Sequence, residues 1–401
     1  GQLSREKASL LQTVRYNRSH WRDGKRSITP HYAMFTVRPS KQGCEIQRKD
    51  LEASKVEEAV SSWREKVEAV ERCVASGSSV CTPPQQKKAH RAMHEAGKAL
   101  RKVVWAPFEK ELQSERVYIV PDGALNQVSF ASLADDKDTF LIEQKTLRYI
   151  PYAAALDAPE REEVSSKGAL FVGDLDYARG FKTSGEALSK WQACSSKGCG
   201  SSKTAVSSKT PKEETRALMG SQTCGYEERA WSRLETGVEE QASRFAKSTG
   251  EETLLVRGSQ AHEQALREKM KGRRVLHLAT HGFFSPKEQC AHLDASKEDG
   301  RLTPMGMEQA PRFTDPLQLS ALVLSGGNKA GSKLDKPEED GLLSAREVVR
   351  LDLRGTEVVT LAACETGLGE NTVGEGSLGL ARAFLVAGAK TAFVSHWQVP
   401  L

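Results

Sequence analysis

The sequence has no long apolar run. None of its 401 residues falls in a stretch near the roughly 18 uninterrupted apolar residues of a transmembrane helix. The first residues, GQLSREKASLLQTVRYNRSHW, are polar and lack the apolar core of a signal peptide. We therefore expect a cytoplasmic protein with no membrane partner.

Paired cysteines are also lacking. The eight cysteines are scattered, and only Cys194 and Cys199 approach the spacing of zinc ligands, with no second pair behind them. The sequence HLATH lacks the glutamate of a helical zinc motif and lies on an expected strand, so we expect no metal. A long chain without a secretion signal is not expected to carry a disulfide framework. We expect free thiols at nearly all of these positions.

Strong net charge is absent too, since the formal value is +5. Much of the excess comes from six lysines against one glutamate between Phe181 and Lys212, in a segment rich in serine and glycine. No aromatic ladder accompanies these lysines, so bases would find no stacking platform. The segment is interpreted as a solvated loop. We expect no direct contact with nucleic acid.

A glycine-rich loop near the C-terminus lacks the cation that a phosphate site needs. Gly369 and Gly374 have the spacing of a phosphate loop, but Glu375 stands where lysine should follow, and it would repel phosphate. The neighbouring GLGENT fails the dinucleotide pattern because Thr372 replaces its last glycine. Nucleotide binding is disfavoured, and no cofactor is expected.

Apolar periodicity predicts an α/β fold. The N-terminal half contains a β-rich run at 32–38, amphipathic helices at about 51–74 and 85–104, and strands in RVYIVPDGAL and LRYIPY. Farther on, helices opened by the boxes Thr236–Glu239 and Ser344–Glu347 and by Ser259 alternate with apolar strands. The strands are ALFVGDLDY, TLLVRG, VLHLATH, ALVLSG, EVVTLAAC and TAFVSHW. This alternation indicates a mostly parallel sheet flanked by helices.

Two of these strands end at reactive side chains. VLHLATHGFF leaves His281 at its end, and EVVTLAACETG leaves Cys364. A lone cysteine there usually packs as a small hydrophobe. Chemistry in open α/β sheets gathers at the carboxyl ends of strands, however, and a cysteine nucleophile needs a base within reach. We expect the two to meet, with the N–H groups of Gly282 and Cys364 holding an oxyanion; His277 is interpreted as core.

Two acidic residues are weaker candidates for substrate binding. Asp340 in EEDGLLS and Glu375 in GEG could line a pocket for a basic side chain. The commoner alternative for each is a solvated loop acid or an acid at a helix start.

Several motifs together resemble a known family. VYIVPDGALNQVSFASL, VLHLATHGFF, DGLLSAREV, LAACETGLGE and GEGSLGLARAFLVAGAKTAFVSHWQV are similar, in that order, to the CHAT domain, a bacterial branch of the caspase and separase clan (clan CD). The likeness runs from about Tyr32 to the end, less the insert. It implies a caspase-like α/β sandwich with a His–Cys dyad, matched here by His281 and Cys364.

The resemblance also suggests a division of the chain. Residues 1–27 are expected to be the end of a helical repeat array, 28–156 the N-terminal part of the CHAT region, and 157–401 the catalytic part with an insert at about 181–225. CHAT domains usually continue past W-x-V with acidic residues and a terminal helix, so this chain, ending in HWQVPL, is expected to be truncated. Ala362 stands where caspases have a pocket glutamine, so their preference for aspartate is not carried over.

The predicted function is that of a cysteine endopeptidase. It would hydrolyse peptide bonds in a protein or peptide substrate, without metal or cofactor, under control of a regulatory partner or an attached helical-repeat domain. The alternative is a catalytically inactive caspase-like scaffold for protein–protein interaction, because a fold alone does not establish an activity.

Overall fold

The structure of the chain is a computed structural model that leaves some segments undescribed. It describes residues 2–23, 25–41, 43–75, 80–157, 164–178, 231–285, 315–329, 340–372 and 376–397. The lysine-rich insert at about 181–225, Glu375 and four of the cysteines lie outside these ranges. Among the described residues no helix is both long and apolar enough to cross a membrane.

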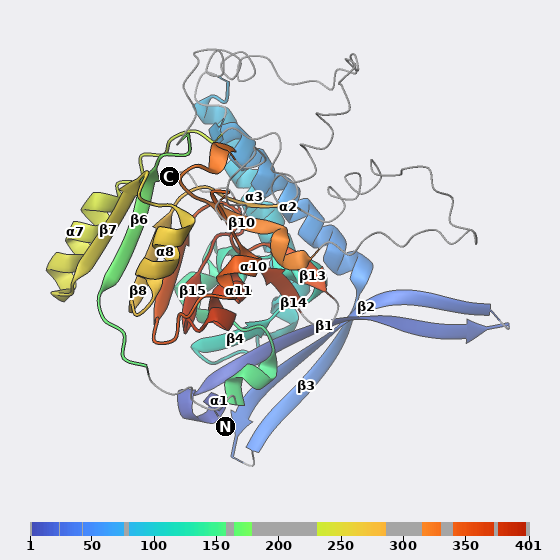
Figure 1. The fold of residues 1–401 in the computed structure, drawn as a ribbon. Helices are drawn as coiled ribbons and strands as arrows, with labels where there is room; N and C mark the ends of the chain where they lie inside the picture. Colours follow the sequence, from blue (N-terminus) through green and yellow to red (C-terminus); the bar gives the residue numbers. More distant parts are fainter. Residues whose placement is uncertain are drawn as a thin grey trace, which may run out of the picture.

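A mixed five-stranded sheet of order β3-β2-β1-β4-β5 forms the N-terminal unit (Figure 1). Its strands are β1 (Ala8–Arg22), β2 (Lys25–Ser40), β3 (Gly43–Glu52), β4 (Arg116–Val120) and β5 (Thr146–Tyr149). The predicted run at 32–38 lies inside β2. Within 1–27, expected as the end of a helical array, the described residues form the short helix α1 (Gln2–Glu6), then β1 and the start of β2. The first half of β1 is a strand buried on both faces, since Leu10 and Leu11 enter different apolar clusters.

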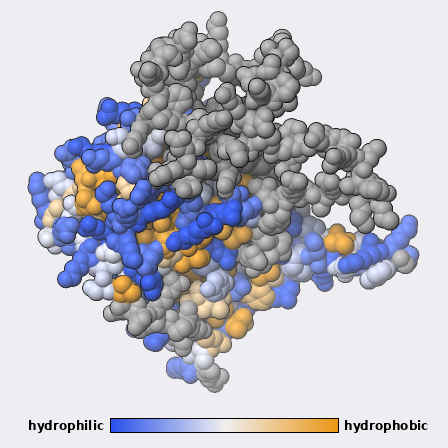
Figure 2. Space-filling view, in the orientation of Figure 1, coloured by the Kyte–Doolittle hydropathy of each residue, from blue (hydrophilic) through white to orange (hydrophobic). Residues whose placement is uncertain are grey.

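A two-stranded ribbon projects from this sheet. From about Asn17 to Pro30 the strands β1 and β2 pair with each other, while β3 pairs with β2 only from His31 onward. The ribbon extends well beyond the rest of the molecule (Figure 1) and its surface is mostly hydrophilic (Figure 2). Trp21 near its tip is 72% exposed.

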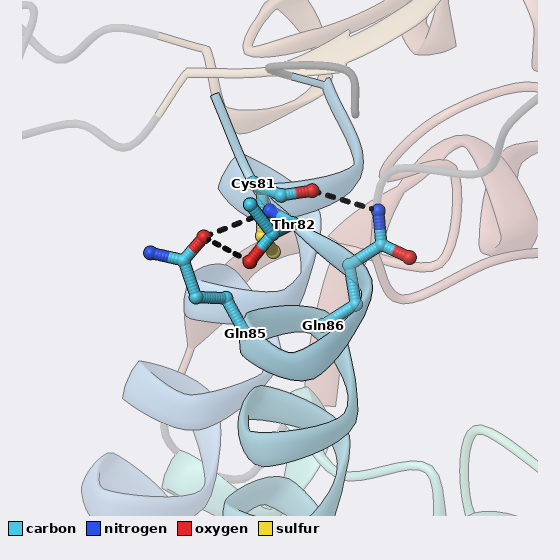
Figure 3. The surroundings of a disulfide bond; sticks show 5 residues. Cys81, Thr82, Gln85 and Gln86 are labelled. Carbon is cyan, nitrogen blue, oxygen red and sulfur yellow. Dashed lines mark hydrogen bonds between the residues drawn. A yellow bond between two sulfur atoms is a disulfide. The ribbon is translucent and has the colours of Figure 1, made fainter. Parts of the chain in front are cut away.

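Two long helices cover the N-terminal sheet. They are α2 (Ala53–Ala75) and α3 (Pro83–Val104), within two residues of the predicted bounds at every end. The apolar face of α2 is buried from Val56 to Val67 in the cluster with the sheet, which also contains Leu141 of the short helix α4 (Leu141–Gln144), whereas Val74 at the end of α2 is exposed. A Cys73–Cys81 disulfide joins α2 to the segment before α3, beside the Thr82 cap (Figure 3). The expectation of free thiols is wrong for this pair, because their Cα atoms lie 5.3 Å apart, within the range of a disulfide.

A second five-stranded sheet, all parallel, forms the C-terminal unit and confirms the predicted α/β fold. Its order is β15-β12-β8-β6-β7. The strands are β6 (Ala169–Leu175), β7 (Thr253–Gly258), β8 (Val275–Ala279), β12 (Val358–Ala362) and β15 (Thr391–Phe393). Alternate residues enter opposite layers: Leu170 and Leu276 pack in the large cluster, whereas Phe171 and Val275 pack in the smaller one.

Helices cover both faces of this sheet. Helix α7 (Val238–Thr249) packs on the face of Phe171, and the opposite layer receives α8 (Glu263–Met270), α10 (Ala345–Val348) and α11 (Leu380–Ala387). The Ser344–Glu347 capping box is confirmed. The Thr236–Glu239 box is wrong, because Gly237 caps α7 and Thr236 donates to Asp174 instead. Helix α8 is capped by His262 rather than Ser259.

Two small antiparallel units complete the fold. Strands β9 (Gly282–Phe284), β10 (Ser320–Val323) and β11 (Leu342–Ser344) form one sheet, and β13 (Gly369–Thr372) pairs with β14 (Gly376–Gly379) in a hairpin. The prediction that ALVLSG joins the parallel sheet is wrong, since β10 runs antiparallel to β9. Every residue of β10 and β11 is buried, so no polar alternation marked the sheet to which they belong.

Candidate active site

His281 and Cys364 follow neighbouring parallel strands at the same level. Strands β8 and β12 pair in register up to Ala279 and Ala362, and the Thr280 N–H still donates to Ala362 O at 3.2 Å. Just beyond, a Cβ atom on Gly282 would lie 2.7 Å from the carbonyl oxygen of Cys364. The two predicted strand ends therefore come together, and Gly282 is in backbone contact with Cys364.

The His281 ring is held by a carbonyl and two aromatic rings. Its Nε2 lies 2.9 Å from the carbonyl oxygen of Ser232. The ring centroid is 4.9 Å from that of Trp231 and 5.1 Å from that of Tyr177. Because a carbonyl only accepts, Nε2 carries the proton, and Nδ1 of the neutral ring has the lone pair. Burial lowers the pKa of His281 below its ordinary value, against a smaller raising effect of the Ser232 bond, so the ring is neutral at pH 7.

Cys364 begins a tight turn, Cys364–Gly367, which we name the Cys364 turn. The Cys364 side chain is half-buried, and Glu365 after it has φ of +57°, a conformation that is uncommon outside glycine. The Thr366 hydroxyl donates to Ala363 O, and the Glu365 carboxylate accepts from the Phe284 N–H at 3.4 Å. The turn thus interrupts the strand at the thiol and is fastened to β9.

The Gly282 N–H points toward the Cys364 turn. In the β9–β10 pair, the Val323 N–H donates to His281 O and the Ser285 N–H donates to Leu319 O. Successive N–H groups on a strand alternate between its two edges. The Phe284 N–H faces Glu365, so the Gly282 N–H, two residues earlier, faces the same edge. This orientation fits the predicted oxyanion donor.

Tyr177 and Trp231, whose rings flank His281, also line a cavity, but neither His281 nor Cys364 is among the described residues that line it. Its volume is about 400 Å³, and it lies at the carboxyl ends of β6 and β7. Residues that line it include Asp174, Asp176, Tyr177, Trp231 and Arg233. Sequence reasoning missed Tyr177, Trp231 and Ser232 as neighbours of the histidine. Only Tyr177 gave a signal, since it follows a predicted strand of the same sheet.

Asp340 is not brought next to His281. It precedes β11, which β10 separates from β9. Its carboxylate accepts from the Leu342 N–H at 2.8 Å, and burial raises its pKa to about 7. Nearby, Arg267 bridges the carboxylates of Glu263 and Glu347. Asp340 is thus a partly buried acid that accepts from the first residue of β11, which is neither the solvated loop acid nor the helix-start acid of the alternative interpretation. Glu375 lies outside the described residues.

His277 is a core residue, as expected. Its ring centroid lies 5.1 Å from that of Phe171, and burial lowers its pKa. Across the described ranges, no three histidine, cysteine or acidic side chains gather as a metal ion would require. The backbone of Gly369–Thr372 pairs with Gly376–Gly379 as a hairpin, whereas a phosphate loop would wrap around a helix start.

Comparison with protein families accounts for this arrangement of strands and strand ends. The family model of the CHAT domain matches residues 94–401, well over half of the chain. The chain belongs to the CHAT domain family. CHAT domains are caspase-like and related to peptidases, in agreement with the parallel sheet and its flanking helices. The match begins inside α3, although β1–β3 share a sheet with β4 and β5 of the CHAT domain. Comparison with curated proteins gives no match.

Proposed function

We propose that this CHAT domain is a cysteine endopeptidase with Cys364 as nucleophile and His281 as base. The observation that carries the proposal is that the two residues lie at the same level, each two positions after the end of β8 or β12, with Gly282 packed against the Cys364 backbone. A neutral imidazole whose Nε2–H is engaged by Ser232 has Nδ1 available for proton transfer.

The proposed reaction has two halves. Sγ of Cys364 attacks the scissile carbonyl while its proton passes to His281, and the N–H groups of Gly282 and Cys364 stabilise the oxyanion. The C–N bond breaks as His281 protonates the leaving amine, which leaves a thioester. Water then gives a proton to His281 and attacks the thioester. The C–S bond breaks, a carboxylic acid leaves, and the thiol is restored.

The substrate would be a protein or peptide, and a regulatory protein or an attached helical-repeat domain remains the proposed source of control. The cavity lined by Tyr177 and Trp231, the two rings that flank His281, would accept a side chain of the substrate. Neither metal nor organic cofactor is used in this scheme.

Labelling with an electrophilic peptide probe tests the proposal against the interaction scaffold. An acyloxymethyl ketone peptide is expected to form its adduct at Cys364, and His281→Ala is expected to slow this by about 100-fold, the usual scale of a lost general base. Peptide mass spectrometry over a time course gives the site and the rate of adduct formation. The exposed free thiol of Cys44 is the internal control. Equal labelling of Cys44 and Cys364 would favour the scaffold.

The acid limb of activity is expected below pH 6.5. Burial lowers the pKa of His281, so the ring stays neutral to a lower pH than free imidazole, and the base is lost only when it protonates. Values of kcat/KM measured from pH 4 to 8 give the midpoint. Trp231→Ala uncovers the ring and is expected to move the midpoint upward, toward about 6.5. A midpoint above 6.5 in the parent protein would rule out this assignment.

A further inference from the structure

The N-terminal unit reaches the C-terminal unit through the 394–397 segment, which follows β15. The Trp63 ring of α2 meets the Trp397 ring edge-on, with centroids 6.4 Å apart. Next to it on α2, Arg64 Nη1 donates to the His396 carbonyl oxygen at 2.8 Å. From β5, the Tyr149 ring lies 6.1 Å from the His396 ring. Trp397 thereby joins the apolar cluster of the N-terminal unit.

The same segment holds the Cys364 turn. The Gly367 N–H donates to Ser395 O at 2.7 Å, and the Glu365 N–H donates to Trp397 O at 3.3 Å. The Ser395 hydroxyl donates to Ala363 O at 2.6 Å, directly before the nucleophile. A Cβ atom on Gly367 would lie 2.9 Å from Ser395 O, so turn and segment are in close contact. Residues on both sides of Cys364 are fixed by this one segment.

The 394–397 segment is therefore held by the N-terminal unit on one side and by the Cys364 turn on the other. Trp397 packs its ring against α2 and gives its carbonyl to the residue after Cys364. Burial, and then the neighbouring Arg64 charge, lower the pKa of His396 to about 4. The ring is neutral at pH 7, so it does not repel the guanidinium that binds its carbonyl. The segment has little freedom to move unless α2 moves with it.

We propose that Trp63 and Arg64 are positioning residues for Cys364, acting through the 394–397 segment, so that α2 is a working part of the active site. The inference rests on the proposed function for its catalytic meaning. The inference further implies that a ligand or partner that displaces α2 would shift the position of Cys364 without contacting Cys364 itself. Both residues lie before residue 94, where the CHAT family match begins.

The test compares Arg64→Ala with Arg64→Lys, which keeps one donor for His396 O. Lys55→Ala is the matched control, since Lys55 lies on the same helix with its side chain 70% exposed and paired with Glu52. Hydrogen exchange is measured on peptides that cover the Cys364 turn and β12. The rate of adduct formation at Cys364 with the peptide probe is measured in parallel. Trp63→Phe serves as a second variant that keeps the core filled.

Arg64→Ala and Trp63→Phe are expected to speed exchange of the Glu365 and Gly367 amides at least about tenfold, with β12 unchanged. Adduct formation is expected to fall about tenfold in Arg64→Ala, because small displacements of a reacting group are costly, and to recover within about threefold in Arg64→Lys. Unchanged exchange in the turn, or an equal effect of Lys55→Ala, would overturn the inference. If the parent protein forms no adduct, the peptidase proposal fails, while the exchange measurement still decides the positioning.

Discussion

Replacing Cys364 by alanine is expected to abolish peptide cleavage, with kcat reduced by roughly 1,000-fold or more. The proposed chemistry passes through a thioester, and no other described group at these strand ends offers a comparable nucleophile. His281→Ala is expected to reduce kcat by about 100-fold or more, as for a lost general base. The double variant should be no slower than Cys364→Ala alone, because the two residues act as one unit. Single-turnover kinetics on a quenched fluorescent peptide measure all three.

Cys44→Ala is the matched control for this series. Cys44 lies on β3 of the N-terminal unit and its thiol is exposed, so its loss should leave kcat unchanged. Thermal unfolding of each variant checks that the fold persists. Cleavage that survives in Cys364→Ala would remove the thiol from the mechanism, and additive losses in the double variant would mean that His281 acts elsewhere.

Gly282→Ala is expected to reduce kcat/KM by about 100-fold or more, the second large effect. The added Cβ would lie 2.7 Å from Cys364 O, 3.1 Å from Thr366 Cγ2 and 3.2 Å from Ala363 Cβ. Because the nearest atom belongs to the backbone, β9 and the Cys364 turn must move apart, and the Gly282 N–H leaves the position of an oxyanion donor. The overpacking should also lower the free energy of unfolding by about 1–3 kcal/mol.

Gly388→Ala is the matched control for Gly282→Ala, because it is expected to lower stability at a position far from the candidate site. Gly388 caps the end of α11, and a Cβ there would lie 2.7 Å from the Arg354 backbone nitrogen. Helix α11 leads back to the start of β15, so Gly388 lies at the amino edge of the sheet, opposite Cys364. Gly388→Ala should lower the unfolding temperature yet leave kcat/KM of the folded protein within about twofold. A Gly282→Ala protein with parental kcat/KM would remove Gly282 from the site.

Elements with one polar face were predictable from the sequence. The stripe of α2 ends up against the N-terminal sheet with Trp63 only 2% exposed, since a helix with one apolar face has a single way to bury it. Strand β10 has no polar face from which its position could be predicted, because it is buried throughout. Its pairing with β9 depends on where the chain bends after β8. The cap of α7 was missed for a local reason: Thr236 donates to Asp174 on β6 instead of capping the helix.

The site was predictable to the same extent. Strand order and register bring the chain segments after β8 and β12 to the same edge of the sheet, as expected for parallel strands. The partners of the imidazole do not follow. Ser232 and Trp231 are about fifty residues away in sequence and come from a stretch with no regular element, so no periodicity connects them to β8. Asp340 shows the opposite error, because the sequence does not reveal that its carboxylate is occupied by the Leu342 N–H of β11.

The boundary of the family match runs through the middle of a folded sheet. A polypeptide beginning at residue 94 would lose the strand whose residues Ala8–Gln12 pair with Arg116–Val120, and would leave β4 with a bare edge of unsatisfied amides and carbonyls. Unpaired strand edges can pair with other chains, so such a fragment would be prone to aggregate in solution. Limits drawn from sequence similarity are thus a poor guide for trimming this protein.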